Sequence, residues 1–148
     1  MKYRLALDDY KLGEYIPISP FYGINPVKID KHICDGEAQE IILESVLEYC
    51  PVENLVHYMG ILARKLAHGG KLIVVNADAT ILAEQFIRGQ LGIIEYNKLL
   101  FGSKDHAYAF KLATIQLCDV EEVGRQVGLK VLEKSLNNFN FIIKFERP

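Results

Sequence analysis

The segment spanning residues 35–75 constrains the fold more than any other part of the chain. It begins with a compact apolar run, residues 38–43, of the kind that forms a buried parallel strand. Pro51 then stands where a helix begins, with Glu53 in its first turn. A second buried strand is expected over residues 72–75. This order of strand, helix and strand is typical of an α/β protein.

The expected helix between these strands has a clear apolar face. Its members recur at helical spacing and predict one buried side: Leu55, Val56, Met59, Leu62, Ala63 and Leu66. Gly69-Gly70 is expected to end the helix, because glycine takes the left-handed conformation at little steric cost.

Composition places the chain among ordinary soluble domains. Its 148 residues suit one domain, so we expect residues 1–148 to form a single unit. The net charge of −2 gives no reason to expect a nucleic acid or an anionic membrane as partner. No apolar run approaches the roughly 20 residues of a membrane span. The three scattered cysteines, Cys34, Cys50 and Cys118, favour a reducing compartment, so a cytoplasmic protein is expected.

The first 34 residues leave room for short strands only, which we expect at residues 3–7, 15–18 and 27–33. No full helix is expected there, because the segment is short and rich in Pro, Gly and aromatic residues.

Helices are expected later in the chain, over residues 80–88 and 93–100. Asp119 with Glu122 resembles a capping box for a helix that ends near Gly128. Two last strands follow, at residues 131–132 and 139–145. In the second, Phe141 and Ile143 alternate with more polar neighbours and are expected to be buried.

Several of these motifs resemble the class I S-adenosylmethionine-dependent methyltransferase family. Leu47-Glu48-Tyr49-Cys50-Pro51 is similar to its L-E-H-x-P, and Leu66 to Gly70 to its L-x-P-G-G turn. Asn76-Ala77-Asp78 and Gly128-Leu129 match further family loops. The resemblance covers nearly the whole chain and is best from residue 35 onward. It implies a Rossmann-like fold: a three-layer arrangement around a seven-stranded, mostly parallel sheet with an antiparallel last strand and a reduced N-terminal half.

The N-terminus departs from this family where the family holds its cofactor. Asp8 and Tyr10 replace the glycines that let the backbone approach the cofactor, and Ser19 replaces the acid that binds the ribose hydroxyls. Asp8, Asp9, Ser19 and Asp30 are candidate cofactor contacts by alignment. The alternative is a collapsed, filled loop.

Beyond the expected fourth strand of the family, Glu44, Ser45 and Leu47 stand where such an enzyme contacts its cofactor, at the carboxyl edge of the sheet. The alternative role of these three residues is turn packing at a helix entry. S-adenosylmethionine is therefore the implied cofactor, and the departures at the N-terminus predict that it binds weakly or not at all.

Residues 101–108 resemble the Y-G-x-x-x-H-x-Y insertion of one small-methyltransferase subgroup. Within them Asp105, His106 and Tyr108 form a candidate catalytic cluster, because a histidine beside a carboxylate can act as a general base. An ion-paired loop is the alternative. A metal is not expected, because His32, Cys34, Asp35 and Glu37 match no common zinc spacing.

Two functions remain open on this evidence. The first is a methyltransferase with a divergent cofactor loop, acting on a small-molecule or sugar-type methyl acceptor. The second is a non-catalytic binding or assembly module that keeps the fold, because fold alone does not define function. A homo-oligomer in which a partner completes the site is a third possibility, since an exposed apolar face favours association.

Overall fold

A computed structural model of the chain describes residues 1–8, 10–18, 29–102 and 110–148. Within these residues the strands form one six-stranded sheet in the order β2-β1-β3-β4-β6-β5. The strand bounds are β1 Lys2–Leu5, β2 Ile16–Ile18, β3 Ala38–Glu44, β4 Leu66–Ala77, β5 Lys130–Asn137 and β6 Asn140–Glu146.

Strand direction matches the expected fold class. Strands β2, β1, β3 and β4 are parallel to one another. Only β6 runs the other way, because it pairs antiparallel with both β4 and β5. The predicted α/β sheet, mostly parallel with an antiparallel last strand, is therefore confirmed. The described residues contribute six of the seven strands that the family resemblance implies.

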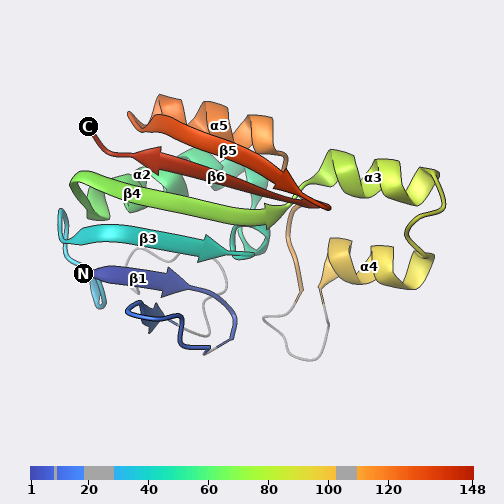
Figure 1. Ribbon diagram of the computed structural model, residues 1–148, viewed down its shortest axis with the longest axis horizontal. Coiled ribbons are helices and arrows are strands. Elements are labelled where there is room, and N and C mark those ends of the chain that lie inside the picture. The colour runs from blue at the N-terminus through green and yellow to red at the C-terminus, as the bar shows by residue number, and fades with distance from the viewer. Residues whose placement is uncertain (9, 19–28, 103–109) are drawn as a thin grey trace.

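The helices are unevenly distributed around this sheet. Their bounds are η1 Leu47–Tyr49, η2 Val52–Asn54, α2 Leu55–Lys65, α3 Ala79–Ile87, α4 Ile93–Phe101 and α5 Leu117–Gln126. Helices α2 and α5 pack on one face, and Figure 1 shows the opposite face without a helix of the described residues across it. Between β1 and β2 the described residues form no helix. Residues 29 and 30 are helical, and residues 19–28 before them lie outside the described residues, so the absence of a full helix before Asp35 stays a prediction.

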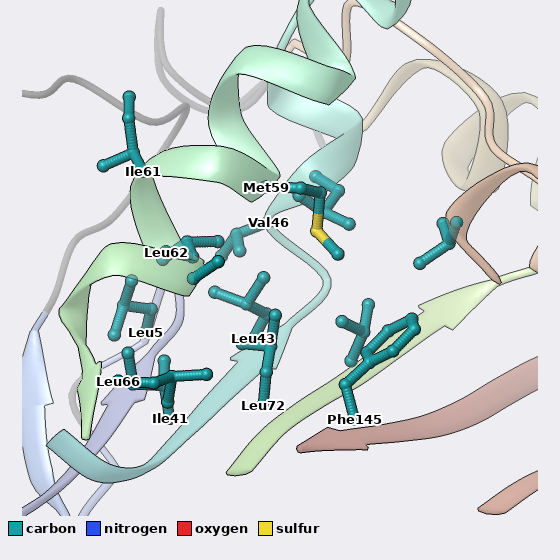
Figure 2. Packing of buried hydrophobic residues seen from close by; sticks show 14 of the residues in the cluster. Leu5, Ile41, Leu43, Val46, Met59, Ile61, Leu62, Leu66, Leu72 and Phe145 are labelled. Atoms are coloured by element: carbon teal, nitrogen blue, oxygen red, sulfur yellow. The ribbon is translucent and has the colours of Figure 1, made fainter. Parts of the chain in front are cut away.

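The main core lies between the sheet and helices α2 and α5. Figure 2 shows Leu5, Ile41 and Leu43 pointing from the strands toward Met59 and Leu62 of α2. Neighbouring strand residues point to the other face because side chains alternate along a strand. Arg4, Ile42 and Ile73 therefore share the face opposite to the core, in paired register.

Helices α3 and α4 form a hairpin that extends beyond the carboxyl end of β4 (Figure 1). Asp78 fixes its start, because Oδ1 of Asp78 accepts from the backbone N–H groups of Thr80 and Ile81. Its other carboxylate oxygen, Oδ2, accepts from the N–H of Leu117 at 2.9 Å and so begins α5 as well. Among the helices of the described residues, none combines the length and apolar character needed to cross a bilayer.

Four local predictions were wrong. Helix α2 ends at Lys65, and Gly69-Gly70 lies inside β4. Residues 29–30 are helical and residues 31–32 form a turn, so the described part of the segment expected as a strand over residues 27–33 is not a strand. Val56 is exposed because it points away from the sheet. The N-cap residue of α5 is Gln116, whose side chain makes no capping hydrogen bond, so Asp119 and Glu122 form no capping box.

Candidate functional site

The carboxyl edge of β1 and β3 brings two predicted cofactor residues together. Asp8 follows β1, and Glu44 ends β3, which pairs directly with β1. In open α/β sheets, ligands bind at this edge. Both carboxylates contact the same side chain, that of Arg4 on β1.

Arg4 is almost completely enclosed, with 3% of its surface exposed. Its Nε group donates to Oε2 of Glu44, and its Nη1 group donates to Oδ1 of Asp8 at 2.8 Å. Nη1 also donates to the backbone oxygen of Tyr10 at 2.9 Å, and the guanidinium lies 5.7 Å from the centre of the Tyr10 ring. The arginine thus lies between the ends of two parallel strands and binds both neighbouring acids.

The electrostatics of this cluster follow from its contacts. The hydrogen bond from Arg4 lowers the pKa of Asp8, and the N–H of Tyr10, which donates to Oδ1 of Asp8 at 3.0 Å, lowers it further. The hydrogen bond to Asp8 raises the pKa of Arg4. Asp8 and Arg4 are therefore both charged at neutral pH, and the positive guanidinium neutralises part of the acidic charge at this edge.

Ser45 and Leu47 occupy the same edge in different ways. Ser45 has a φ of 55°, in the left-handed region that is unfavourable for residues other than glycine. Its N–H donates to the oxygen of Val75 at 2.9 Å. The turn directs Leu47 into the core, where its side chain is buried. In this structure Ser45 is exposed and accessible to a ligand, whereas Leu47 is not.

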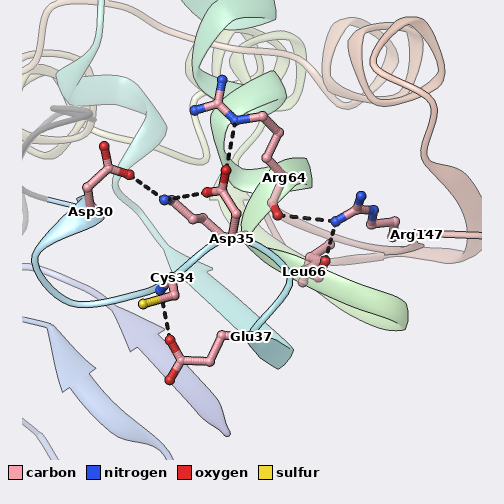
Figure 3. Close-up of polar contacts among 8 residues, drawn as sticks. Asp30, Cys34, Asp35, Glu37, Arg64, Leu66 and Arg147 are labelled. Atoms are coloured by element: carbon pink, nitrogen blue, oxygen red, sulfur yellow. Dashed lines mark hydrogen bonds and ion pairs between the residues drawn. The ribbon is translucent and has the colours of Figure 1, made fainter.

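Asp30 lies at the opposite edge of the sheet from Asp8 and Glu44. Figure 3 shows the carboxylates of Asp30 and Asp35 near each other. Lys65, the last residue of α2, donates to both of them. Lys65 directly precedes β4, and Asp35 precedes β3, so this cluster marks the amino edge. The structure therefore separates Asp30 from the other cofactor candidates.

The remaining predicted site residues cannot be placed. Asp9 and Ser19 of the cofactor set lie outside the described residues, and so do the catalytic candidates Asp105, His106 and Tyr108.

A second polar cluster, which we did not predict, lies at the same carboxyl edge. Glu48 in η1 is buried, and both of its carboxylate oxygens accept from Nζ of Lys111 at 3.0 Å. Lys111 also donates to the backbone oxygen of Leu99 at 2.8 Å. Burial raises the pKa of Glu48, and the nearby Lys111 offsets part of that effect.

Asn76, near the end of β4, belongs to this buried cluster. Its Nδ2 group donates to the oxygen of Ala77 at 3.2 Å, whereas its buried Oδ1 has no hydrogen-bond partner among the described residues. An unpaired buried acceptor costs free energy, which makes it a position that a donor on a ligand would stabilise. A pocket of about 330 Å³ borders the cluster, lined by Lys111 together with Leu100, Phe101, Leu112, Ala113 and Thr114.

Sequence reasoning missed these residues for different reasons. Arg4 carried a local signal, because a charged residue stands between Tyr3 and Leu5 in a short strand. Glu48 appeared only as part of a family motif. No local sequence pattern pointed to Lys111, because it lies 63 residues after Glu48 in the sequence and meets Glu48 only in the folded protein.

No protein-family model matches this sequence, and no curated protein matches it either. Solved structures do resemble it. The PH0226 protein from Pyrococcus horikoshii OT3 superposes with a TM-score of 0.59 at 13% identity, over 91% of this chain and 60% of that one. An O-methyltransferase family protein from Burkholderia thailandensis gives 0.56 at 13% identity, over 91% and 36%.

Magnesium protoporphyrin IX methyltransferase from Synechocystis PCC 6803, solved with bound S-adenosylhomocysteine, gives a TM-score of 0.52 at 15% identity, over 89% of this chain and 52% of that one. At such identities the likeness concerns the fold alone. The chain has the fold of the class I S-adenosylmethionine-dependent methyltransferases. It spans 30% to 57% of the length of the first solved structures that it matches.

Proposed function

We propose that this chain is a methyltransferase-like protein with a degenerate cofactor site, which serves as a binding or assembly module. It binds S-adenosylmethionine with a dissociation constant on the order of 100 µM or worse, or not at all. The observation that carries this proposal is the enclosed Arg4 between Asp8 and Glu44.

Charge is the first support. The sulfonium and amino groups of S-adenosylmethionine are positive, and Asp8 and Glu44 are the acids that would receive them at this edge. Both acids already bind Arg4. A charge-assisted hydrogen bond contributes roughly 1.5–3 kcal/mol, so the loss of one weakens binding by about one to two decades.

Shape is the second support. Where the family has glycines, Asp8 and Tyr10 fold around the guanidinium, and the Tyr10 ring lies over it. Leu47 is buried and presents no surface to a ligand. The described residues at this edge therefore do not fit the cofactor in the way the family resemblance implies.

Isothermal titration calorimetry with S-adenosylmethionine and S-adenosylhomocysteine tests the proposal. The wild-type protein should give no saturable heat below about 100 µM ligand. Arg4→Ala frees both carboxylates and should strengthen S-adenosylmethionine binding about tenfold, which corresponds to one charge-assisted bond. Lys2→Ala is the matched control, because Lys2 is a more exposed cation on the same strand that pairs with Glu14. Micromolar binding by the wild type that Arg4→Ala does not change would contradict the proposal.

The second candidate function is methyl transfer to a small-molecule or sugar-type acceptor. The buried cluster of Glu48, Asn76 and Lys111 favours it, because an unpaired acceptor atom and a bordering pocket lie at the edge where the family carries out its chemistry. Incubation with S-adenosylmethionine labelled at the methyl group and a panel of hydroxylated acceptors tests this function. Labelled product that disappears in Asn76→Leu would support it, and the absence of product across the panel would reject it.

A further inference from the structure

Two adjoining pockets lie at the amino edge of the sheet, opposite the edge that carries Arg4. Their volumes are about 330 Å³ and about 310 Å³. Arg64 of α2 and Arg147, directly after β6, line both pockets, and every lining residue belongs to the described part of the chain. These volumes are at the lower end of the roughly 300–1,000 Å³ of small-molecule sites, so a ligand that fits here is small.

The side chain of Arg147 is held in place at the boundary between the pockets. Its backbone N–H donates to the oxygen of Gly70 at 2.9 Å, and its own oxygen accepts from the N–H of Gly69 at 2.7 Å. Nη1 of Arg147 donates to the backbone oxygens of Arg64 and Leu66. A guanidinium has five N–H groups, of which Nη1 carries two. The other three have no hydrogen-bond partner among the described residues.

Arg64 brings a second guanidinium to the same boundary. Figure 3 shows its side chain extending toward Asp35, while Arg147 reaches the backbone at the end of α2. Nε of Arg64 lies 3.8 Å from Oδ2 of Asp35, which is beyond hydrogen-bond reach. Guanidinium groups bind carboxylates through paired N–H···O bonds, so the two arginines are suited to a carboxylate between the pockets.

The larger pocket, which we call the apolar pocket, is otherwise lined by residues without charge. Gly60 and Ala63 of α2 face Val127 and Leu129, which follow α5. A Cβ at Gly60 would meet only Val127, at 3.8 Å, so the glycine leaves space between α2 and the chain after α5. The burial of an apolar group is favourable, which makes this pocket suitable for an aliphatic side chain.

The smaller pocket, which we call the polar pocket, contains an acid. Asp35 and His68 line it together with the two arginines. Oδ1 of Asp35 accepts from Nζ of Lys65 at 2.6 Å, whereas Oδ2 has no hydrogen-bond partner among the described residues. The hydrogen bond from Lys65 lowers the pKa of Asp35, so the carboxylate is charged at neutral pH. It can therefore accept from a cationic group of a ligand.

We propose that the two pockets form a binding site for a free aliphatic amino acid such as leucine. The carboxylate of the ligand binds Arg64 and Arg147 at the boundary, and its side chain occupies the apolar pocket. Its ammonium group donates to Oδ2 of Asp35 in the polar pocket. The three groups of an amino acid extend from one carbon atom, so a carboxylate at the boundary directs the other two into opposite pockets.

This site is independent of the proposed cofactor behaviour. It lies at the amino edge of the sheet, and its lining residues include none of Arg4, Asp8 and Glu44. Failure of one proposal therefore leaves the other untouched, because their ligands should affect different backbone amides.

Titration of the isotopically labelled full chain with leucine, followed by backbone amide chemical shifts, tests the site. The amides of Gly60, Val127 and Gly128 should shift and saturate with a dissociation constant of about 1 mM or tighter. Leucinamide lacks the carboxylate and isocaproate lacks the ammonium group. Each should bind at least tenfold more weakly than leucine, because one charge-assisted bond is lost. No saturation up to about 10 mM leucine, or equal binding of isocaproate and leucine, would overturn the proposal.

Two substitutions assign the charged groups of the ligand. Arg64→Met should weaken leucine binding at least tenfold. Arg88→Met is the matched control, since Arg88 is an exposed arginine at the end of α3 that lines neither pocket, and it should leave binding unchanged. Asp35→Asn should weaken the binding of leucine but not that of isocaproate, because only leucine carries an ammonium group. Equal effects of the two arginine variants, or an equal loss of both ligands in Asp35→Asn, would contradict the assignment.

A third substitution tests the apolar pocket. Gly60→Leu fills the space beside Val127 and should reduce leucine binding to the level of glycine binding. Circular dichroism checks that each variant is folded, which is expected because Arg64 and Asp35 are largely exposed and Lys65 keeps Asp30 as a partner. A folded Gly60→Leu variant that binds leucine as tightly as the wild type would overturn the proposal.

Discussion

Arg4 is the residue that most affects the chemistry of the carboxyl edge. It occupies a position in a short strand where an apolar residue would be ordinary, and its enclosure depends on Asp8, Tyr10 and Glu44. The strands themselves were predictable from the apolar runs, so the sequence was sufficient to predict that Asp8 and Glu44 lie near the same edge of the sheet. The bond of both acids to Arg4 was not, because it depends on the register of β1 against β3.

Asp8 should make a small, pH-dependent contribution to stability. Its folded-state pKa lies below the ordinary value of 3.8, so its stabilisation is present above that value and is lost as pH falls through the lowered pKa. Since Asp8 is largely exposed, Asp8→Asn should reduce the free energy of unfolding at pH 7 by under about 1 kcal/mol. Urea denaturation at pH 7 and pH 3 checks this, and a difference from wild type that persists undiminished at the lower pH would count against the ion pair.

Glu48 and Lys111 should behave as one buried unit. Removal of either partner alone leaves an unpaired group, so Glu48→Gln or Lys111→Met should cost about 3 kcal/mol, whereas the double variant should cost clearly less than the sum. A double-mutant cycle by chemical denaturation measures this coupling. Additive effects would show that the two residues contribute independently.

The pH dependence of Lys111→Met has a defined sign. Loss of the lysine raises the folded-state pKa of Glu48 further, because burial is then unopposed. A carboxyl group with a raised folded pKa stabilises the protein at low pH, and that contribution is lost as pH rises through the folded pKa. The free energy of unfolding of the variant, relative to wild type, should therefore fall as the pH rises above 4.5, the ordinary pKa of a glutamate. Urea denaturation over a series of pH values measures this fall.

At the scale of helices and strands, substitution of two helix glycines by alanine should change the stability of the protein in opposite directions. A Cβ at Gly60 in α2 would meet only Val127, at 3.8 Å, so Gly60→Ala should stabilise the protein by about 0.5–1 kcal/mol through helix propensity. A Cβ at Gly124 in α5 would lie 2.2 Å from the buried ring of Phe145, so Gly124→Ala should destabilise by about 1–3 kcal/mol. Thermal denaturation of the pair checks both signs, and equal shifts would mean that α5 does not approach β6 this closely.

A buried residue of β6 and an exposed residue of β5 give a second matched pair of substitutions. Phe141 is fully buried, so Phe141→Ala should cost about 3–5 kcal/mol. Leu136 pairs with it across the ladder of β5 and β6 but is exposed, so Leu136→Ala should change stability by less than about 0.5 kcal/mol. A cost below 1 kcal/mol at Phe141 would show that its ring is not in the core.

Helices and strands whose apolar residues recur at a regular spacing could be predicted from the sequence, but the residues at which they begin and end could not. The apolar runs in β3 and β4 and the alternation in β6 gave the correct strands, because burial on one face requires those periods. Gly69-Gly70 misled the prediction of the helix end. A Cβ at Gly70 would lie only 2.7 Å from the backbone oxygen of Ala67. The register of β3 against β4 also shifts nearby, so the two glycines allow an irregularity in strand β4. In the sequence alone, two glycines that allow a strand irregularity cannot be distinguished from two glycines that end a helix.

For the whole molecule, the methyltransferase-like fold follows from the order of its elements, and the helices of the described residues cover the sheet unevenly. The resemblance to the family implied helices on both faces, and the described residues place α2 and α5 on one. The absence of full helices that the composition before residue 35 favours stays a prediction, because residues 19–28 lie outside the described residues. The exposure of α4 was not predictable, since its apolar spacing is equally that of a helix packed on both sides.

The most direct test of the degenerate site is a titration of the isotopically labelled protein with S-adenosylmethionine, followed by backbone amide chemical shifts in nuclear magnetic resonance. The account predicts small shifts at Asp8, Glu44 and Ser45 that do not saturate below about 100 µM ligand, because Arg4 already binds the two acids. Large shifts at these residues that saturate at micromolar ligand would contradict it and would make the chain a cofactor-binding methyltransferase.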